Sequence, residues 1–320
     1  MKKTICLILL LLLCTPLLAA CRDRTETVRV WTLNGTTGFG MAPMIAADDQ
    51  RYSFTVEKDA TVVRDAILSE SADIAALPVN VAATLYNATN GGVKILALNT
   101  GSVLYVVSNE EPPTSLAALS GKTVYMPAQN PTFIMQALLK QAGINDVVLD
   151  STTYSTPDDL KEAVAAGLVT LAVLPEPMVT VAQNAAAKKG RDIKIALDIG
   201  AVWDTYFEEG SLVQGCVVVR TAFLEEHPEA VAAFLQDYEN AIRYVNQNPE
   251  SAAQQIKQAQ ILGNAEVAAA ALPRCNILFQ SGADMQRACD AFLATMPPKA
   301  IGGKLPDDHF YYFEMTEDHE

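Results

Sequence analysis

Short apolar segments with strand character alternate with segments of helical periodicity along most of the chain. Residues 28–33 and 73–78 are two such apolar runs, and residues 61–69 between them place their apolar side chains on one helical face. Strands that are apolar throughout are buried on both faces, which is typical of parallel sheets covered by helices. The alternation therefore predicts an α/β fold in which mostly parallel sheets are flanked by helices.

The alternation is interrupted at Glu110-Glu111-Pro112-Pro113 and then begins again. Residues 122–126, 170–174 and 193–197 have strand character in this second part, with helical patterns between them. The last hundred residues are mostly helical by pattern, and we interpret their apolar stripe as core packing. The sequence thus predicts two α/β units in one chain.

The first twenty residues have the pattern of a signal peptide. Lys2 and Lys3 precede an apolar run over residues 5–18, which is shorter than the about 20 residues that a membrane-spanning helix needs. The run ends in Leu18-Ala19-Ala20-Cys21, which resembles the bacterial lipobox, where the cysteine thiol is joined to diacylglycerol. We therefore expect cleavage after residue 20, lipidation of Cys21, a linker over residues 21–27, and an exported protein that is lipid-anchored to the cell membrane, facing the periplasm or the cell exterior. The alternative is an ordinary signal peptide cut near Ala20.

The charge and the composition exclude one large class of function. The formal net charge is −14 at pH 7, and half of the residues are apolar. Such a surface repels phosphate backbones, so we expect no nucleic-acid partner. No second apolar run reaches the length of a membrane span, so we expect contact with the membrane through the lipid anchor only.

The cysteines give no metal signature. Cys216 lies in an apolar strand pattern and is most simply a small core residue. Cys275 and Cys289 are close in sequence, and in an exported protein they are either a disulfide or two free thiols. We expect no metal site and no cofactor.

Known catalytic motifs are absent from the sequence. His227, His309 and His319 have no neighbouring nucleophile or carboxylate in a motif, and there is no G-x-S-x-G, P-loop or H-E-x-x-H pattern. The glycines at positions 35, 38 and 40 are in the reverse order of a dinucleotide fingerprint. These observations argue against an enzyme.

Polar and glycine-rich residues gather where predicted strands pass into helices. Ligands of parallel α/β sheets bind at these carboxyl ends of the strands, so the loops predict a ligand site. Each loop taken alone could be a simple turn or a helix cap. The candidate ligand-binding residues are Asn34, Thr36, Thr37, Gly38, Asn80, Thr100, Gly101, Asn130, Thr132 and Glu176.

Several segments in a fixed order carry a family resemblance. They are residues 33–38, 73–80, 101–107, 119–124, 174–177 and 217–220. In these segments the chain resembles the solute-binding proteins of bacterial ABC transporters, in the branch that binds nitrate, taurine or other alkanesulfonates, and thiamine pyrimidines.

The resemblance implies a two-lobed type II periplasmic-binding-protein fold, with a mostly parallel sheet in each lobe and two hinge strands near residues 103–108 and 214–220. Lobe 1 would hold residues 28–107 and 216–320, and lobe 2 residues 108–215. A small molecule would bind in the cleft of a monomer, which then delivers it to ABC permease and ATPase subunits.

The ligand class stays open at this point. Trp203 and Tyr206 follow the last strand of the second unit and either stack on a ligand ring or pack under a loop. A carboxylate at Glu176 facing the cleft would repel sulfonate or nitrate and favour a nitrogen heterocycle. The alternatives to transport are a ligand-sensing lipoprotein on the same fold and an enzyme of pyrimidine- or menaquinone-precursor synthesis.

Overall fold

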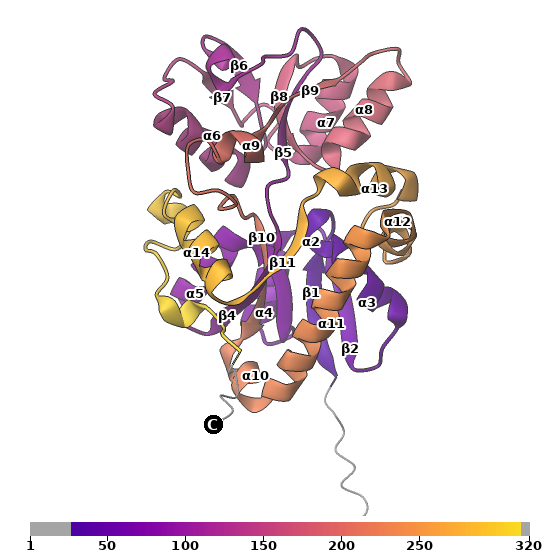
Figure 1. The fold of residues 1–320 in the computed structure, drawn as a ribbon, viewed down its shortest axis with the longest axis vertical. Coiled ribbons are helices and arrows are strands. Elements are labelled where there is room, and N and C mark those ends of the chain that lie inside the picture. Colours follow the sequence, from indigo (N-terminus) through magenta and orange to yellow (C-terminus); the bar gives the residue numbers. More distant parts are fainter. Residues whose placement is uncertain (1–26, 315–320) are drawn as a thin grey trace, which may run out of the picture.

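The computed structural model describes residues 27–314, so the predicted signal peptide and Cys21 lie outside the described residues. Two lobes lie one above the other, and each is built around its own sheet (Figure 1). Among the described residues, no helix has the length and apolar character that a membrane span requires.

The sheet of lobe 1 has the strand order β11-β4-β10-β3-β1-β2. Strands β1, β2 and β3 pair in parallel, whereas β10 is antiparallel to both β3 and β4, and β11 is antiparallel to β4. Four of the six strands therefore point the same way, with their carboxyl ends toward lobe 2. The strands are β1 (Val28–Leu33), β2 (Tyr52–Glu57), β3 (Ile74–Pro78), β4 (Val93–Thr100), β10 (Gly215–Arg220) and β11 (Ile277–Gln280).

The sheet of lobe 2 has the order β7-β6-β8-β5-β9. Only β5 runs against the others in this sheet, since it is antiparallel to both β8 and β9. The predicted two-lobed fold with mostly parallel sheets is confirmed. The strands are β5 (Leu104–Ser108), β6 (Thr123–Tyr125), β7 (Val148–Asp150), β8 (Leu171–Pro175) and β9 (Lys194–Asp198).

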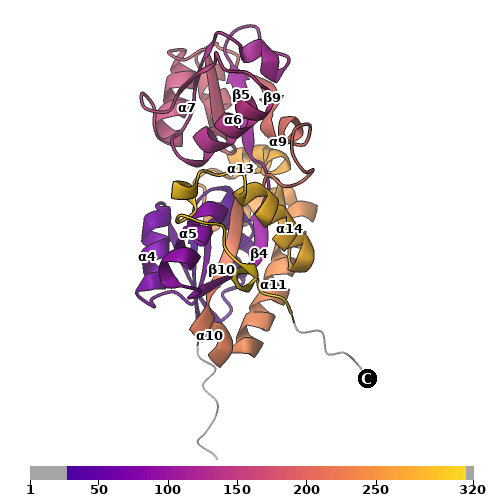
Figure 2. The same cartoon turned by 90° about the vertical axis from the view of Figure 1, so that its left-hand side faces the viewer.

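Helices cover both faces of each sheet (Figure 2). In lobe 1, α4, α5 and α14 pack on one face, and α3, α11, α12 and α13 pack on the other. The helices are α2 (Thr36–Phe39), α3 (Ala42–Ala47), α4 (Ala60–Leu68), α5 (Val79–Thr89), α6 (Asn130–Gln141), α7 (Pro157–Ala166), α8 (Met178–Ala187), α9 (Ile199–Trp203), α10 (Thr221–Glu226), α11 (Pro228–Gln247), α12 (Pro249–Gln258), α13 (Ala265–Ala271) and α14 (Gly282–Leu293), with 3-10 turns η1 (Leu116–Leu119), η2 (Leu272–Arg274), η3 (Pro298–Ala300) and η4 (Asp308–Phe310).

The first passage between the lobes differs from the predicted boundary at residue 107. Strand β5 belongs to the sheet of lobe 2, so the chain leaves lobe 1 at residues 101–103. The apolar run from β4 into β5 hides this change of sheet, because both strands are buried. The return passage enters β10 through Gln214, whose backbone N–H donates to the Thr100 carbonyl at 2.9 Å.

Cys275 and Cys289 are free thiols, so the disulfide alternative is wrong. Cys275 follows the turn η2 and Cys289 lies in α14, and the two belong to the cores on opposite faces of the lobe 1 sheet. Burial raises the pKa of both thiols well above the ordinary value. Cys216 is buried in β10, as its strand pattern predicts.

A buried ion-pair cluster joins three strands at the end of lobe 1 remote from lobe 2. The Asp73 carboxylate accepts from Arg29 Nε at 2.9 Å and from Arg220 Nη2 at 2.9 Å, and its side chain is 2% exposed. Burial alone would raise the pKa of Asp73, but the hydrogen bonds from Arg29 and Arg220 outweigh it and lower that pKa below its ordinary value. Asp73 therefore stabilises the fold as an anion.

We expect Asp73→Asn to lower the free energy of unfolding by about 3 kcal/mol at pH 7, because the arginines lose their buried counter-charge. A lowered folded-state pKa gives stability that is present above the unfolded-state pKa of about 4 and is lost as the pH falls through the folded value. Urea unfolding at pH 7 and at pH 3 measures both effects. The control Asp65→Asn removes an exposed pair with Arg64 and should cost less than about 1 kcal/mol. Equal losses in the two variants would contradict the role of Asp73.

Candidate ligand site between the lobes

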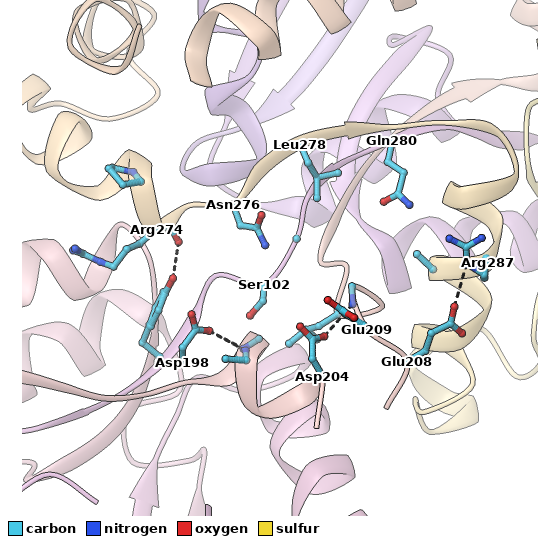
Figure 3. A pocket seen from close by; sticks show the side chains of 18 residues that line it. Ser102, Asp198, Asp204, Glu208, Glu209, Arg274, Asn276, Leu278, Gln280 and Arg287 are labelled. Atoms are coloured by element: carbon cyan, nitrogen blue, oxygen red, sulfur yellow. Dashed lines mark hydrogen bonds and ion pairs between the residues drawn. The ribbon is translucent and has the colours of Figure 1, made fainter. Parts of the chain in front are cut away.

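A pocket of about 550 Å³ lies between the lobes, where three chain segments meet (Figure 3). The first segment is the passage at Gly101 and Ser102. The second runs from the start of α9 through the loop before β10, and the third runs from residues 273–280 into α14. The volume is in the range of pockets that hold small molecules, about 300–1,000 Å³. A ligand in this pocket touches both lobes.

The start of α9 is fixed by a capping aspartate. Asp198 ends β9, and its carboxylate accepts from the backbone N–H groups of Gly200 at 2.8 Å and Ala201 at 3.4 Å. Gly200 packs directly on Ser102, since an added Cβ would lie 2.8 Å from the Ser102 Cβ. The absence of a side chain at Gly200 thus lets α9 approach the passage between the lobes.

Residues 273–280 make a further connection across the lobes. The backbone N–H of Gly101 donates to the Asn276 carbonyl at 3.0 Å, and the Tyr105 hydroxyl donates to the Arg274 carbonyl at 3.0 Å. Burial, with Asp198 and Glu176 nearby, raises the pKa of Tyr105 far above its ordinary value, so this hydroxyl remains a donor.

Glu176 does not face the cleft as a bare carboxylate, contrary to the sequence-based interpretation. Its side chain is fully buried, and Oε1 accepts from Arg274 Nε at 2.6 Å. Thr180 donates to the same carboxylate through its backbone N–H and its hydroxyl. A buried carboxylate needs such partners, and Arg274 from lobe 1 supplies the counter-charge. The argument that Glu176 repels anions therefore fails.

A second ion pair crosses between the lobes at the other end of the pocket. Arg287 Nε on α14 lies 3.1 Å from the Glu208 carboxylate, and Nη1 lies 2.9 Å from Asp284 (Figure 3). All three side chains are about half exposed or more, so this pair contributes little to stability.

Of the candidate residues from the sequence, Gly101 lines this pocket. Thr36, Thr37 and Gly38 form the short helix α2 above the ends of β1 and β3. Gly38 is required there, since a Cβ would collide with the Leu33 carbonyl oxygen. Asn34 is exposed and borders a different pocket, with Glu57, Lys58 and Gln258.

Four other candidate asparagines and threonines lie at helix starts or at a strand end. Asn80, at the start of α5, donates through Nδ2 to the Ala300 carbonyl at 3.4 Å, and its buried Oδ1 has no hydrogen-bond partner among the described residues. The buried Oδ1 of Asn130, at the start of α6, is likewise unpaired, whereas the Thr132 hydroxyl donates to Pro127. The Thr100 hydroxyl donates to Asn99. In Figure 2, α5 and α6 lie on one side of the passage between the lobes, and α9 and α14 lie on the other.

The two aromatic candidates lie in different environments. Trp203 is fully buried, stacks on Phe207 with ring centroids 4.1 Å apart, and donates from its indole nitrogen to the Ser211 hydroxyl at 2.8 Å. Trp203 therefore packs under a loop, which is the second of the two alternatives that the sequence leaves open. Tyr206 is exposed and does not line the pocket.

Sequence reasoning missed most of the pocket wall. Asp198 follows a strand and precedes a helix, so the same rule that selected Asn80 could have found it. Arg274 and Asn276 carry no such signal, because they lie in a C-terminal region that reads as helical packing. Strand β11, which follows them, was not predicted either.

We expect Arg274→Gln to lower the free energy of unfolding by about 2–3 kcal/mol, because it leaves the buried Glu176 carboxylate without a counter-charge. The double variant Arg274→Gln with Glu176→Gln should recover part of the loss. Arg243→Gln is the matched control, since Arg243 pairs with Glu239 on the surface of one helix. Chemical unfolding measures the stability of all these variants. If Arg274→Gln loses no more stability than the control, the ion pair of Arg274 with Glu176 does not stabilise the fold as proposed.

Comparisons with known proteins agree with this architecture. The family model described as menaquinone biosynthesis matches residues 38–296. An ABC transporter protein from Parabacteroides distasonis is 22% identical, with a TM-score of 0.76 over 90% of this chain and 100% of that one. The periplasmic aliphatic sulphonate binding protein SsuA from Escherichia coli is 16% identical, with a TM-score of 0.68 over 90% and 92% of the two chains.

More distant structures share the same fold. The periplasmic nitrate-binding protein NrtA from Synechocystis is 16% identical, with a TM-score of 0.56 over 76% of this chain and 69% of that one. No sequence among the curated proteins matches the chain significantly. The match of the family model over most of the sequence decides membership: the chain belongs to the menaquinone biosynthesis family, on the two-lobed fold of the periplasmic binding proteins of ABC transporters.

Proposed function

We propose that the protein is an extracytoplasmic solute-binding protein that captures a small organic molecule between its lobes and delivers it to an ABC permease. The observation that carries this proposal is the pocket at the passage between the lobes. A ligand that contacts both lobes stabilises the arrangement in which they are close together, and a permease can distinguish that arrangement from an open one.

The pocket residues Ser102, Asp198, Arg274 and Asn276 are the principal binding candidates. Thr36, Thr37, Asn80, Asn130 and Thr132 remain a second set, because they follow strands whose carboxyl ends face the opposite lobe. The unpaired side-chain oxygens of Asn80 and Asn130 support this assignment, since a buried acceptor without a partner favours a ligand that brings a hydrogen-bond donor.

The lipid anchor belongs to the same proposal. A tether at Cys21 would keep the binding protein near its permease and raise their effective concentration. The apolar run and the lipobox-like sequence at residues 18–21 support it.

A second candidate function is an enzyme of menaquinone-precursor synthesis, which the family model favours. The histidines of the described residues, His227 and His309, do not line the interlobe pocket, so a general base there would have to be one of the carboxylates in its wall. Change in the mass of a bound ligand on incubation with the purified protein would favour the enzyme over the binding protein.

We expect a ligand carried through purification to be detected by native mass spectrometry and to raise the melting temperature when added back. Asn276→Ala should weaken its binding about tenfold, because the amide overhanging Gly101 is lost from the pocket wall. Asn145→Ala, in an exposed loop of lobe 2, is the control and should bind normally. Failure to find any ligand, with no thermal shift across a broad metabolite panel, would contradict the proposed function.

We expect Cys21→Ala to move the protein from the membrane fraction to the soluble fraction, because the thiol that accepts diacylglycerol is missing. Cys14→Ala, within the apolar run, should leave the protein with the membrane. Fractionation followed by detergent partitioning measures both variants. A membrane-bound Cys21→Ala protein would exclude lipidation at this residue.

A further inference from the structure

The interlobe pocket has an excess of carboxylates in its wall. Four acidic residues line it, and the cationic side chains in the same wall are Arg274 and Arg287. The acidic residues are Asp198, Asp204, Glu208 and Glu209.

Both arginines are already paired. Arg274 is held by the buried Glu176 carboxylate, and its Nη2 donates to the Thr180 hydroxyl at 2.9 Å. Arg287 lies between Glu208 and Asp284. Neither arginine therefore offers an uncompensated positive charge to a ligand.

The other carboxylates meet no cation among the described residues. Asp198 accepts backbone N–H groups at the start of α9, and Asp204 accepts the backbone N–H of Gly210 at 3.0 Å. Glu209 lies beside Asp204 at the pocket (Figure 3). The pocket thus retains a negative field from three carboxylates, which attracts cations and repels anions.

An independent observation at Ser102 indicates that this pocket is built for a ligand. Ser102 is 8% exposed, and its buried Oγ has no hydrogen-bond partner among the described residues. Ser102 lies in the middle of the pocket, between Asn276 and the two aspartates (Figure 3). An unpaired buried hydroxyl is costly, and a ligand with a polar group at this point would satisfy it.

We infer that the interlobe pocket binds a small organic cation of the amine, amidinium or quaternary ammonium class. A polar group of the same ligand forms a hydrogen bond with the Ser102 hydroxyl. This inference rests on the proposed binding function and names its ligand class. The cationic group lies among Asp198, Asp204 and Glu209. A sulfonate or nitrate would meet the same three carboxylates without a free arginine to offset them.

Pairs of probes that differ only in charge test the inference. Benzamidine is compared with benzamide, and choline with 3,3-dimethyl-1-butanol, by calorimetry or ligand-observed NMR on the full chain. Ethanesulfonate and nitrate are the anionic probes. We expect each cation to bind at least tenfold more tightly than its neutral partner, and the preference to shrink as the salt concentration rises.

A matched pair of variants assigns the preference to the pocket. The variant Asp198→Asn, Asp204→Asn, Glu209→Gln removes three pocket charges, and asparagine at position 198 can still cap α9. The variant Glu110→Gln, Glu111→Gln, Glu225→Gln removes three exposed charges elsewhere. We expect the first variant to lose the preference for cations and the second to keep it.

The outcomes separate this inference from the proposed function. If ethanesulfonate or nitrate binds best and Asn276→Ala weakens it, the pocket binds a ligand and the cation assignment is wrong. If the two variants lose the preference equally, the field of the whole protein causes it and the assignment is again wrong. If no probe binds and no ligand is carried through purification, the proposed function fails as well.

Discussion

A small group of backbone and amide hydrogen bonds around Gln214 holds the two lobes in register. Its N–H donates to the Thr100 carbonyl, its carbonyl accepts from the Val79 N–H, and its side-chain Oε1 accepts from the Val103 N–H at 3.0 Å. Val103 in turn accepts from the Glu176 N–H at 2.8 Å. These bonds join both passages and the loop after β8, so the placement of the two lobes around the interlobe pocket depends on them.

The charges around this junction are divided between two tasks. The buried carboxylate of Glu176 pairs with Arg274 and fixes the C-terminal segment to lobe 2, so the charge of this arginine is already compensated. The exposed carboxylates at Asp198 and Asp204 are held by backbone N–H groups alone. The same arrangement therefore stabilises the junction and leaves the pocket wall negative, although proteins with this fold include binders of sulfonate and nitrate.

The sequence alone predicts the two α/β units, because apolar strands and amphipathic helices are local patterns. It does not predict the pocket, because Arg274 and Asn276 reach it from a C-terminal segment that is distant in sequence from Ser102 and Asp198. Long-range packing also determines that Cys275 and Cys289 form no disulfide, since their spacing in sequence cannot show that they lie on opposite faces of a sheet. The sequence places Glu176 correctly at a strand end, but its partner Arg274 is 98 residues away. Because of this ion pair, Glu176 is a buried structural carboxylate and does not repel anions in the cleft.

The place of β10 in the lobe 1 sheet has a consequence for the order of folding. This strand lies between β3 and β4, yet it follows the whole of lobe 2 in the chain. Lobe 2 is one continuous segment and can complete its sheet during synthesis, whereas lobe 1 has a gap at its centre until residues 215–220 emerge. We therefore expect the lobe that is first in sequence to be the last to close its core, because that core needs contacts of long sequence separation.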